Sequence, residues 1–314
     1  MNAPAFIFSA GYCNVLILFY ILSLRERKGV MIMLAVTFKR GVHPPDHKEM
    51  AADVPIQKLE AKEGMELIFP LSQHIGPPCA PLVNVGDEVV IGQKIADSQA
   101  RLTSPIFASI SGKVTAIGPA AAPNGAQVQA IFITADGKNT SLPFTGLSAQ
   151  EQASPEKILE AVHQAGIVGM GGAGFPAQVK FSPPPTDTID TVILNGAECE
   201  PYLTCDYRLM LEDPRTIIKG LECMLQLFPA AKGIIGIECN KPKAIESMMK
   251  ACEGMQRITV QPLQTKYPQG GEKQLIYALT KREVPSGGLP SNVGCIVSNA
   301  ATARAIGIAV AQGT

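Results

Sequence analysis

Two short segments of the chain carry residue types that suit a phosphate-bearing ligand. The first, residues 169–176, reads GMGGAGFP, so glycine or proline occupies five of its eight positions. Backbone without side chains can approach a ligand closely, and its N–H groups can surround a phosphate. Lys180 follows this segment and supplies a positive charge for the same anion. We therefore expect residues 169–180 to form an anion-binding loop.

The second segment, residues 195–201, reads NGAECEP and brings one amide and two carboxylates together. The amide of Asn195 can donate and accept hydrogen bonds toward a ring or a ribityl chain. Pro201 restricts the backbone beside Glu200, which favours a functional role for that carboxylate. For Glu198 two interpretations stay open, a ligand contact and a solvated loop acid.

The glycine spacing also matches the dinucleotide-binding fingerprint Gly-x-Gly-x-x-Gly, at Gly169, Gly171 and Gly174. That fingerprint follows a strand and opens a helix. Here the preceding residues, 158–164, have the apolar pattern of a helix instead. The loop is therefore not expected to be a generic NAD site.

Other patterns argue against several classes of chemistry. The eight cysteines include no Cys-x-x-Cys pair, which argues against a zinc ribbon or an iron–sulfur run. Basic and acidic residues balance at 27 each, so no net field favours nucleic acid. The segment HPPDHK at residues 43–48 holds two histidines and an aspartate, but its prolines keep it extended and no third anchor follows. We predict no metal site and a structural or interface role for this segment.

An α/β domain is expected to position the two loops. Ser154 suits a helix N-cap and Pro155 the first turn, which predicts a helix directly before the glycine loop. Downstream of the loop, strands alternate with helices, which predicts a mainly parallel sheet. The expected strands are residues 189–194, 233–238 and 258–260, and the expected helices are residues 214–228 and 242–252.

The region before this domain alternates short β-prone pieces with turns. A Gly-Asp turn at residues 86–87 separates two apolar runs, and a similar pattern returns over residues 104–117. This resembles the barrel-sandwich hybrid of biotinyl and lipoyl domains, which need a lysine at the tip of the central hairpin. The tip here reads SQAR at residues 98–101, and Arg101 cannot form the amide. We therefore expect a structural module and no carrier function.

The N-terminus has a different character. Residues 3–24 form an apolar run of 22 residues that is long enough to span a bilayer, and Arg25, Arg27 and Lys28 follow it. Two interpretations stay open, an anchor that leaves the remaining chain in the cytoplasm, and translation from an upstream start. The second is favoured, with Met31 or Met33 as the native start. The expected regions are an extension at 1–32, a barrel-sandwich region at 33–136, a linker at 137–154 and the α/β domain at 155–314.

Four segments in sequence order resemble one known family, the RnfC proteins of Rnf ion-translocating oxidoreductases. They are residues 43–48 (HPPDHK), 70–76 (PLSQHIG), 169–176 and 195–210. The NADH- and FMN-binding flavoprotein of respiratory complex I is a more distant resemblance. The implied fold is an N-terminal barrel-sandwich hybrid followed by a Rossmann-like α/β domain that binds FMN and NADH.

The resemblance also implies site residues. It implies that the FMN is held by the loop and its lysine, through Gly169, Gly171, Gly172, Gly174 and Lys180. It places Asn195 and Asn299 on the flavin side, with Asn299 in a segment, residues 298–302, that opens a helix below the flavin. Acids around the flavin and nicotinamide would be Glu198, Glu200 and Glu272, with Gly271 in the loop that closes over the nucleotide. Glu200 is the expected catalytic residue, and Phe175 is either a cofactor contact or a packing residue.

The implied function is electron input, with a hydride passing from NADH to FMN and electrons then leaving one at a time. Family members continue into a region with two 4Fe–4S clusters, whose ligands are not found in these 314 residues, so we expect a truncated chain. The implied partners are NAD(H) and the other Rnf membrane subunits, at the cytoplasmic face of the bacterial inner membrane as a peripheral protein, with no nucleic acid. Two alternatives stay open, a non-catalytic assembly or docking fragment and a cobalamin-reductase-like flavoprotein.

Overall fold

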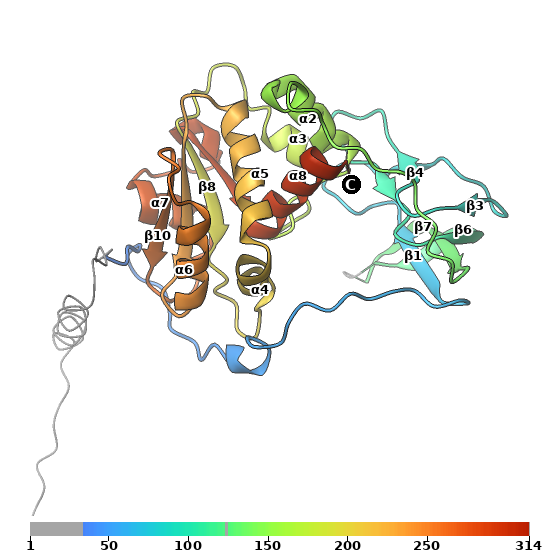
Figure 1. Ribbon diagram of the computed structural model, residues 1–314, viewed down its shortest axis with the longest axis horizontal. Coiled ribbons are helices and arrows are strands. Elements are labelled where there is room, and N and C mark those ends of the chain that lie inside the picture. Colours follow the sequence, from blue (N-terminus) through green and yellow to red (C-terminus); the bar gives the residue numbers. More distant parts are fainter. Residues whose placement is uncertain (1–33, 123–124, 314) are drawn as a thin grey trace, which may run out of the picture. The chain divides into compact units, whose positions relative to one another are not determined.

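The computed structural model describes residues 34–122 and 125–313 (Figure 1). The apolar run at residues 3–24 and both candidate start methionines lie outside the described residues. Across the described ranges, no helix has both the length and the apolar character needed to cross a membrane. From Val36 onward the chain forms one compact unit.

Short antiparallel strands build the first half of this unit. A four-stranded sheet has the order β1-β7-β6-β3, and a three-stranded sheet has the order β2-β4-β5. Their core is made of inward-facing aliphatic side chains such as Ile95, Val114 and Ile131, all fully buried. The strand bounds are β1 Glu66–Pro70, β2 Ala80–Pro81, β3 Glu88–Val89, β4 Lys94–Asp97, β5 Ile106–Phe107, β6 Gly112–Ala121 and β7 Gln127–Ala135.

The second half is built on a parallel sheet with the order β10-β9-β8-β11. The strands are β8 Thr191–Gly196, β9 Lys232–Glu238, β10 Ile258–Leu263 and β11 Cys295–Asn299. The fold class predicted from the sequence, a barrel-sandwich hybrid followed by an α/β domain with a mainly parallel sheet, is therefore confirmed.

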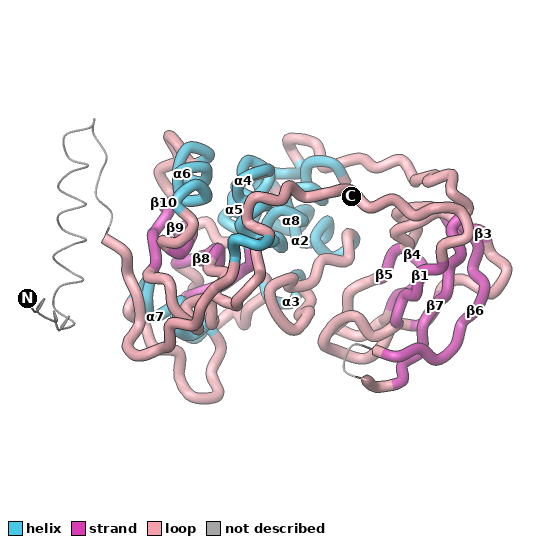
Figure 2. Tube along the Cα trace, turned by 90° about the horizontal axis from the view of Figure 1, so that it is seen from below, coloured by secondary structure: helices cyan, strands magenta, loops and turns pink. Residues whose placement is uncertain are grey.

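Helices cover both faces of this sheet, as Figure 2 shows. Helices α2, α5, α6 and α8 share one core with Val192 and Leu194 of β8. Helix α7 packs on the opposite face with Ile193, because successive side chains of a strand alternate between its faces. The helices are α2 Pro155–Gln164, α3 Ala177–Lys180, α4 Cys205–Glu212, α5 Pro214–Leu227, α6 Pro242–Ala251, α7 Glu272–Thr280 and α8 Ala300–Gln312, with short 3-10 turns η1 Lys48–Met50, η2 Glu151–Ala153 and η3 Pro290–Val293.

Most of the elements predicted for this half are present with shifted ends. The N-cap at Ser154 is confirmed, since its side chain accepts a hydrogen bond from the backbone of Lys157. The strand predicted at 189–194 begins two residues later, and the one predicted at 258–260 continues to Leu263. Helices α4 and α7 and strand β11 were not predicted, because their residues lack a clear apolar period.

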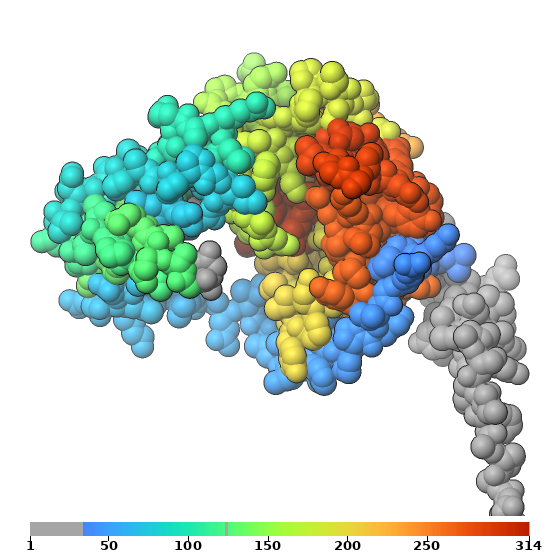
Figure 3. Space-filling model, turned by 180° about the vertical axis from the view of Figure 1, so that it is seen from behind, coloured from blue at the N-terminus to red at the C-terminus, as the bar shows by residue number. Residues whose placement is uncertain are grey.

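Residues 36–56, here called the N-terminal strap, lie against the α/β half of the chain. Val36 forms a parallel bridge with Leu263 at the end of β10, and Val42 pairs with Tyr267 in the loop that follows. At the other end, the carbonyl of Ala52 accepts a hydrogen bond from Arg208 of α4. Figure 3 shows this strap in blue, in contact with the orange and yellow parts of the chain.

Candidate functional site

A cavity of about 390 Å³ opens at the carboxyl ends of β8 and β11. This edge is where ligands bind in open α/β sheets. Most of the residues predicted from the sequence line it, namely Gly169, Gly171, Gly172, Phe175, Lys180, Asn195, Glu200, Gly271, Glu272 and Asn299. Gly174 and Glu198 do not line it.

The glycine loop is fixed against the start of helix α8. The backbone N–H of Met170 donates to the hydroxyl of Thr302 over 3.0 Å, and the N–H of Gly169 donates to the Phe175 carbonyl over 2.9 Å. A Cβ atom at Gly171 would lie 2.8 Å from the amide nitrogen of Asn299, so glycine is required for this close approach. The loop therefore presents bare backbone to the cavity.

Gly174 serves the loop in a different way. It has a positive φ of 66°, and its carbonyl accepts a hydrogen bond from the backbone of Ile75 over 3.2 Å. A Cβ atom there would lie 3.1 Å from the carbonyl oxygen of Gln73. The structure thus gives Gly174 a role in shaping the loop, not a place in the cavity wall.

Asn299 caps helix α8 with its side chain. Its Oδ1 accepts from the backbone of Ala301 and Thr302, at 2.8 and 3.3 Å, and its Nδ2 donates to Asp206 over 2.6 Å. Both ends of the amide are therefore engaged within the protein. The start of this 13-residue helix faces the glycine loop, and a helix N-terminus carries a partial positive charge.

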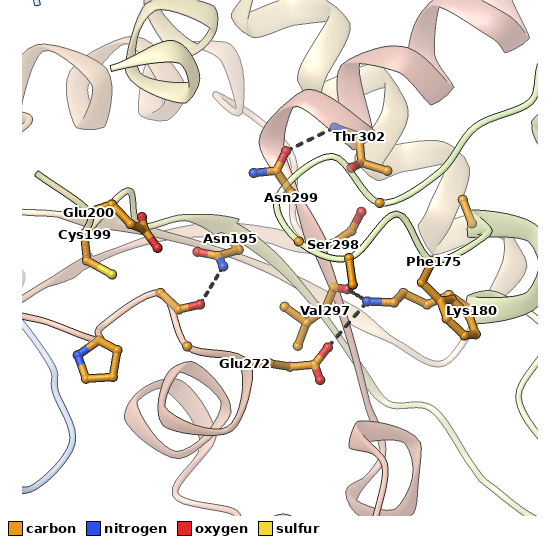
Figure 4. Close-up of a pocket in the computed structure, with 18 of the residues that line it drawn as sticks. Phe175, Lys180, Asn195, Cys199, Glu200, Glu272, Val297, Ser298, Asn299 and Thr302 are labelled. Carbon is orange, nitrogen blue, oxygen red and sulfur yellow. Dashed lines mark hydrogen bonds and ion pairs between the residues drawn. The ribbon is translucent and has the colours of Figure 1, made fainter. Parts of the chain in front are cut away.

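Lys180 ends helix α3 and extends along the cavity wall, as Figure 4 shows. Its ammonium donates to the carbonyl of Val297 over 3.0 Å and forms an ion pair with Glu272 at 3.4 Å. About a third of the Lys180 side chain is exposed, so the ion pair is a weak one. The lysine can exchange its carboxylate partner for a ligand anion without losing the backbone contact.

Asn195 joins the loops that border the cavity at the end of β8. Its Nδ2 donates to the carbonyl of Gly270 over 2.9 Å, and its Oδ1 accepts from the backbone of Ala197 over 3.1 Å. Glu200 is exposed on the adjoining loop and lines the cavity. Its carboxylate makes no hydrogen bond or ion pair within the described part of the chain. Glu200 is therefore free to contact a ligand, whereas Asn195 is used to hold the site together.

Glu198 is placed differently from both sequence interpretations. It is only 4% exposed, and its carboxylate accepts hydrogen bonds from the backbone of Asp206 and Tyr207 at 3.0 and 3.4 Å. It thus caps the N-terminus of helix α4, where negative charge is favourable. Solvated loop acid is the wrong description, and its carboxylate does not reach the cavity.

Two pKa values on helix α4 reflect this packing. Burial, followed by the charge of Glu198, raises the pKa of Asp206 to about 6. Burial and the hydrogen bond to Glu198 likewise raise the pKa of the Cys205 thiol to about 11. Sequence reasoning did not identify Asp206, although it lies in the segment 195–210, because its contact with Asn299 spans 93 positions of the chain.

A second cavity of about 440 Å³ adjoins the first and shares Phe175, Lys180, Glu272 and Val297 with it. Its remaining walls are mostly apolar, with prolines and aliphatic side chains. Arg101, from the loop predicted to stand at the hairpin tip, also lines it and has no hydrogen-bond or ion-pair partner among the described residues. This cavity therefore combines flat apolar walls with positive charge.

No group of three or more histidine, cysteine, aspartate or glutamate side chains is arranged to hold a metal ion in residues 34–122 and 125–313. The segment at residues 43–48 instead packs on the protein. Asp46 accepts from the side chain of Asn240 over 2.9 Å, and the ring of His47 stacks on Tyr202 with centroids 5.2 Å apart.

Comparison with known proteins gives two matches to family models. The RnfC barrel sandwich hybrid domain matches residues 36–138, and the Nuo51 FMN-binding domain matches residues 162–307. A solved structure of an NAD+-reducing NiFe hydrogenase in its air-oxidized state aligns at 26% identity with a TM-score of 0.45, over 52% of this chain and 31% of that one.

Two curated relatives cover most of this chain. The RnfC-type component of the proton-translocating ferredoxin:NAD(+) oxidoreductase complex of Clostridium ljungdahlii is 48% identical over 88% of this chain and 60% of its own. Its counterpart in the Na(+)-translocating complex of Acetobacterium woodii is 44% identical over 86% of this chain and 61% of its own. The chain thus spans about three fifths of the length of these relatives. The two domain matches in order, and these identities, show that the chain belongs to the RnfC family.

Proposed function

We propose that the first cavity holds FMN and that the chain is the electron-input part of an Rnf-type ion-translocating oxidoreductase. The observation that carries this proposal is the convergence of a bare glycine loop, the N-terminus of α8 and Lys180 on one cavity. Such an arrangement binds a phosphate through backbone N–H groups and one mobile cation. The match to an FMN-binding domain over these same residues supports the choice of cofactor.

The residues of this site fit such a group. Gly172 has open space around the position of a Cβ atom, so a ligand can lie against its backbone. Lys180 would hold the phosphate, and Asn195 and Asn299 would keep the cavity walls in register. When bound, FMN accepts a hydride from NADH and releases the electrons singly. The protein contributes binding and orientation, and none of its side chains acts as a nucleophile or as a general acid.

The second cavity is the proposed place for the nicotinamide nucleotide. Apolar walls suit the flat faces of a base, while Lys180 and Arg101 suit its phosphates. The shared wall of Phe175 and Glu272 would bring the two ligands together. Glu200, at the open side of the first cavity, would orient the nicotinamide end. The names of the two relatives, which are oxidoreductases of NAD(+), support this assignment.

The relatives are subunits of ferredoxin:NAD(+) oxidoreductase complexes, which supports further proposals about partners. Electrons would pass to an acceptor carried by the rest of such a complex. The partners would be the other membrane subunits, and the chain would lie at the cytoplasmic face of the membrane.

A titration of the full chain with NADH tests the proposal. The purified protein is loaded with FMN and titrated without oxygen, and we expect the visible flavin band to bleach at one NADH per FMN. Bound FMN that fails to bleach would reject the reductase function and favour a docking role. Failure to bind FMN would reject the assignment of the cavity.

The same preparation tests the role of Lys180. Removing one charged hydrogen bond to a phosphate costs about 1.5–3 kcal/mol, so Lys180→Ala should weaken FMN binding by about 10- to 100-fold. Lys157→Ala is the matched control, because Lys157 lies on the exposed side of α2 and pairs only with Glu160. Equal FMN affinity in the two variants would count against a phosphate contact at Lys180.

A further inference from the structure

The N-terminal strap contacts both loops that form the Glu200 side of the cavity. Residues 198–204 contribute Cys199 and Glu200 to the lining, and residues 265–271 contribute Tyr267 and Pro268. The strap lies outside the region that matches the FMN-binding domain, residues 162–307. Its contacts with these loops therefore join a separate part of the sequence to the site.

Lys48 makes the central contact with the first loop. The residue is 8% exposed, and its ammonium donates to the backbone carbonyls of Glu200, at 2.9 Å, and Leu203. One buried cation thus holds two carbonyls on either side of the bend at Pro201. Charge-assisted hydrogen bonds of this kind are stronger than neutral ones, so they restrict the loop backbone.

Two further contacts hold the same loop from outside. The backbone N–H of Tyr202 donates to the carbonyl of Asp46 over 2.8 Å. The ring of Tyr202 stacks on His47, and the residue has a positive φ of 69°, which is unusual for a side-chain-bearing residue. The strap therefore supports a strained backbone position directly beside Glu200.

The second loop is held by the beginning of the strap. Lys266, itself 7% exposed, donates to the carbonyls of Phe38 and Arg40 at 2.6 and 2.7 Å, and its ammonium lies 4.0 Å from the centre of the Phe38 ring. Val42 and Tyr267 exchange two backbone hydrogen bonds of 2.9 and 2.8 Å. Both walls of the cavity on this side are thus tied to one strap.

The charges around Lys48 explain why it remains buried. Lys48 shares a small cavity of about 110 Å³ with Glu198 and Glu238, both of which are buried. Lys241 forms a 2.9 Å ion pair with Glu238 in the same place. Two lysines therefore balance two glutamates beneath the loop, and removing one lysine would leave an uncompensated buried carboxylate.

We propose that the N-terminal strap is a positioning element of the cofactor site, with Lys48 as the positioning residue for Glu200. Lys48 acts through the backbone of residues 198–204 and does not contact the ligand. The effect on the nicotinamide nucleotide rests on the proposed function, whereas the effect on the loop does not. The strap should therefore influence NADH binding strongly and FMN binding weakly, because the glycine loop, Lys180 and α8 hold the FMN.

The test substitutes Lys48→Met in the full chain, which keeps the length of the side chain and removes the charge. In the FMN-free protein, amide hydrogen exchange of residues 198–204 should become about tenfold faster or more, while exchange in β6 and β7 stays unchanged. In the FMN-loaded protein, the KM for NADH should rise about tenfold, with the FMN dissociation constant within about threefold of wild type.

Three variants complete the design. Lys58→Met is the matched control, since Lys58 is 83% exposed and pairs only with Glu60, and it should change nothing. Glu200→Gln should raise the KM for NADH without faster exchange of the loop. Tyr202→Leu removes the stack from an exposed position, so it should fold even where Lys48→Met does not, and it should also accelerate exchange.

The possible outcomes separate the two proposals. Unchanged exchange at residues 198–204 in both Lys48→Met and Tyr202→Leu would overturn the strap, whatever NADH does. Faster exchange with an unchanged KM for NADH would overturn the positioning of Glu200. A wild-type protein that does not react with NADH would reject the proposed function, while the exchange result still tests the strap.

Discussion

At the scale of single residues, the polar side chains of this site divide into two groups. Asn195, Asn299 and Glu198 spend their hydrogen bonds on backbone groups and thereby build the walls. Lys180 and Glu200 keep atoms available to a ligand. A residue near a cofactor therefore does not need to contact that cofactor, and only the first group would lower stability strongly when mutated.

Asp206 should make the stability of the protein depend on pH. Its pKa is raised from 3.8 to about 6, by burial first and by Glu198 second, while Asn299 and Lys241 act in the opposite direction. Between these values the folded chain binds more protons than the unfolded chain. This contribution to stability is therefore complete below pH 4 and is lost as the pH rises through 6.

Asp206→Asn removes this titration and keeps an oxygen that accepts from Asn299. We expect the variant to exceed the wild type in free energy of unfolding by about 1–3 kcal/mol at pH 7.5, and the difference to vanish at pH 4. Urea unfolding of both FMN-free proteins across this range measures it, and the subtraction cancels the other titrating groups. A difference that stays constant from pH 4 to 7.5 would refute the raised pKa.

The sequence reveals some of these residue roles and conceals others. The glycine loop, Lys180 and Glu200 are adjacent in sequence to what they do, so residue type and spacing predict them. The helix cap at Glu198 depends on α4, whose apolar period is weak, and the Lys180–Glu272 pair joins positions 92 residues apart. Such pairings arise only when the sheet brings the ends of its strands together.

At the scale of elements, helices α5 and α8 pack unusually closely because glycines meet at their crossing. A Cβ atom at Gly220 would lie 1.7 Å from the carbonyl oxygen of Ala303, and one at Gly307 would lie 2.3 Å from that of Thr216. Helix α8 begins at Asn299 in the cavity wall. The position of the cavity wall therefore depends on this helix contact about one to two turns away.

Gly220→Ala should be destabilising although alanine favours helices. The gain in helix propensity is about 1 kcal/mol, but the added methyl group must displace the backbone of α8, so we expect a net loss of about 2 kcal/mol or more in free energy of unfolding. FMN affinity should fall as well, because the start of α8 moves. Urea unfolding and FMN titration measure the two effects.

The control for this substitution is Gly118→Ala, where no atom lies within 4 Å of the added Cβ and φ is not positive. It should change stability by no more than about 0.5 kcal/mol. If Gly220→Ala were equally harmless, the close approach of α5 and α8 would not be required for the fold.

The parallel sheet itself was predictable from its alternation with helices, since buried strands such as Lys232–Glu238 are short apolar runs. The strap was not predictable as a part of this half. Its residues 36–56 carry no periodic pattern, and their partners lie more than 150 positions downstream. Only backbone hydrogen bonds and buried lysines record that contact, and neither leaves a sequence period.

At the scale of the whole molecule, the hydrophobic residues form separate cores. One cluster contains only residues of the barrel-sandwich half, between Phe69 and Ala135. Two others contain residues of the α/β half, on either face of the parallel sheet. Cooperative unfolding follows shared cores, so two groups of residues with separate cores can unfold in separate steps.

FMN should therefore protect one of these halves and not the other. At a free concentration 100 times its dissociation constant, a ligand stabilises the unit that binds it by about 2.7 kcal/mol. Hydrogen exchange in increasing urea, with and without FMN, reads the two halves separately through peptides from β6–β7 and β8–β9. We expect the FMN-dependent shift in β8–β9 alone. An equal shift in both would mean that the two cores unfold as one unit, and the strap and the loop at Ile75 would then be strong enough to couple them.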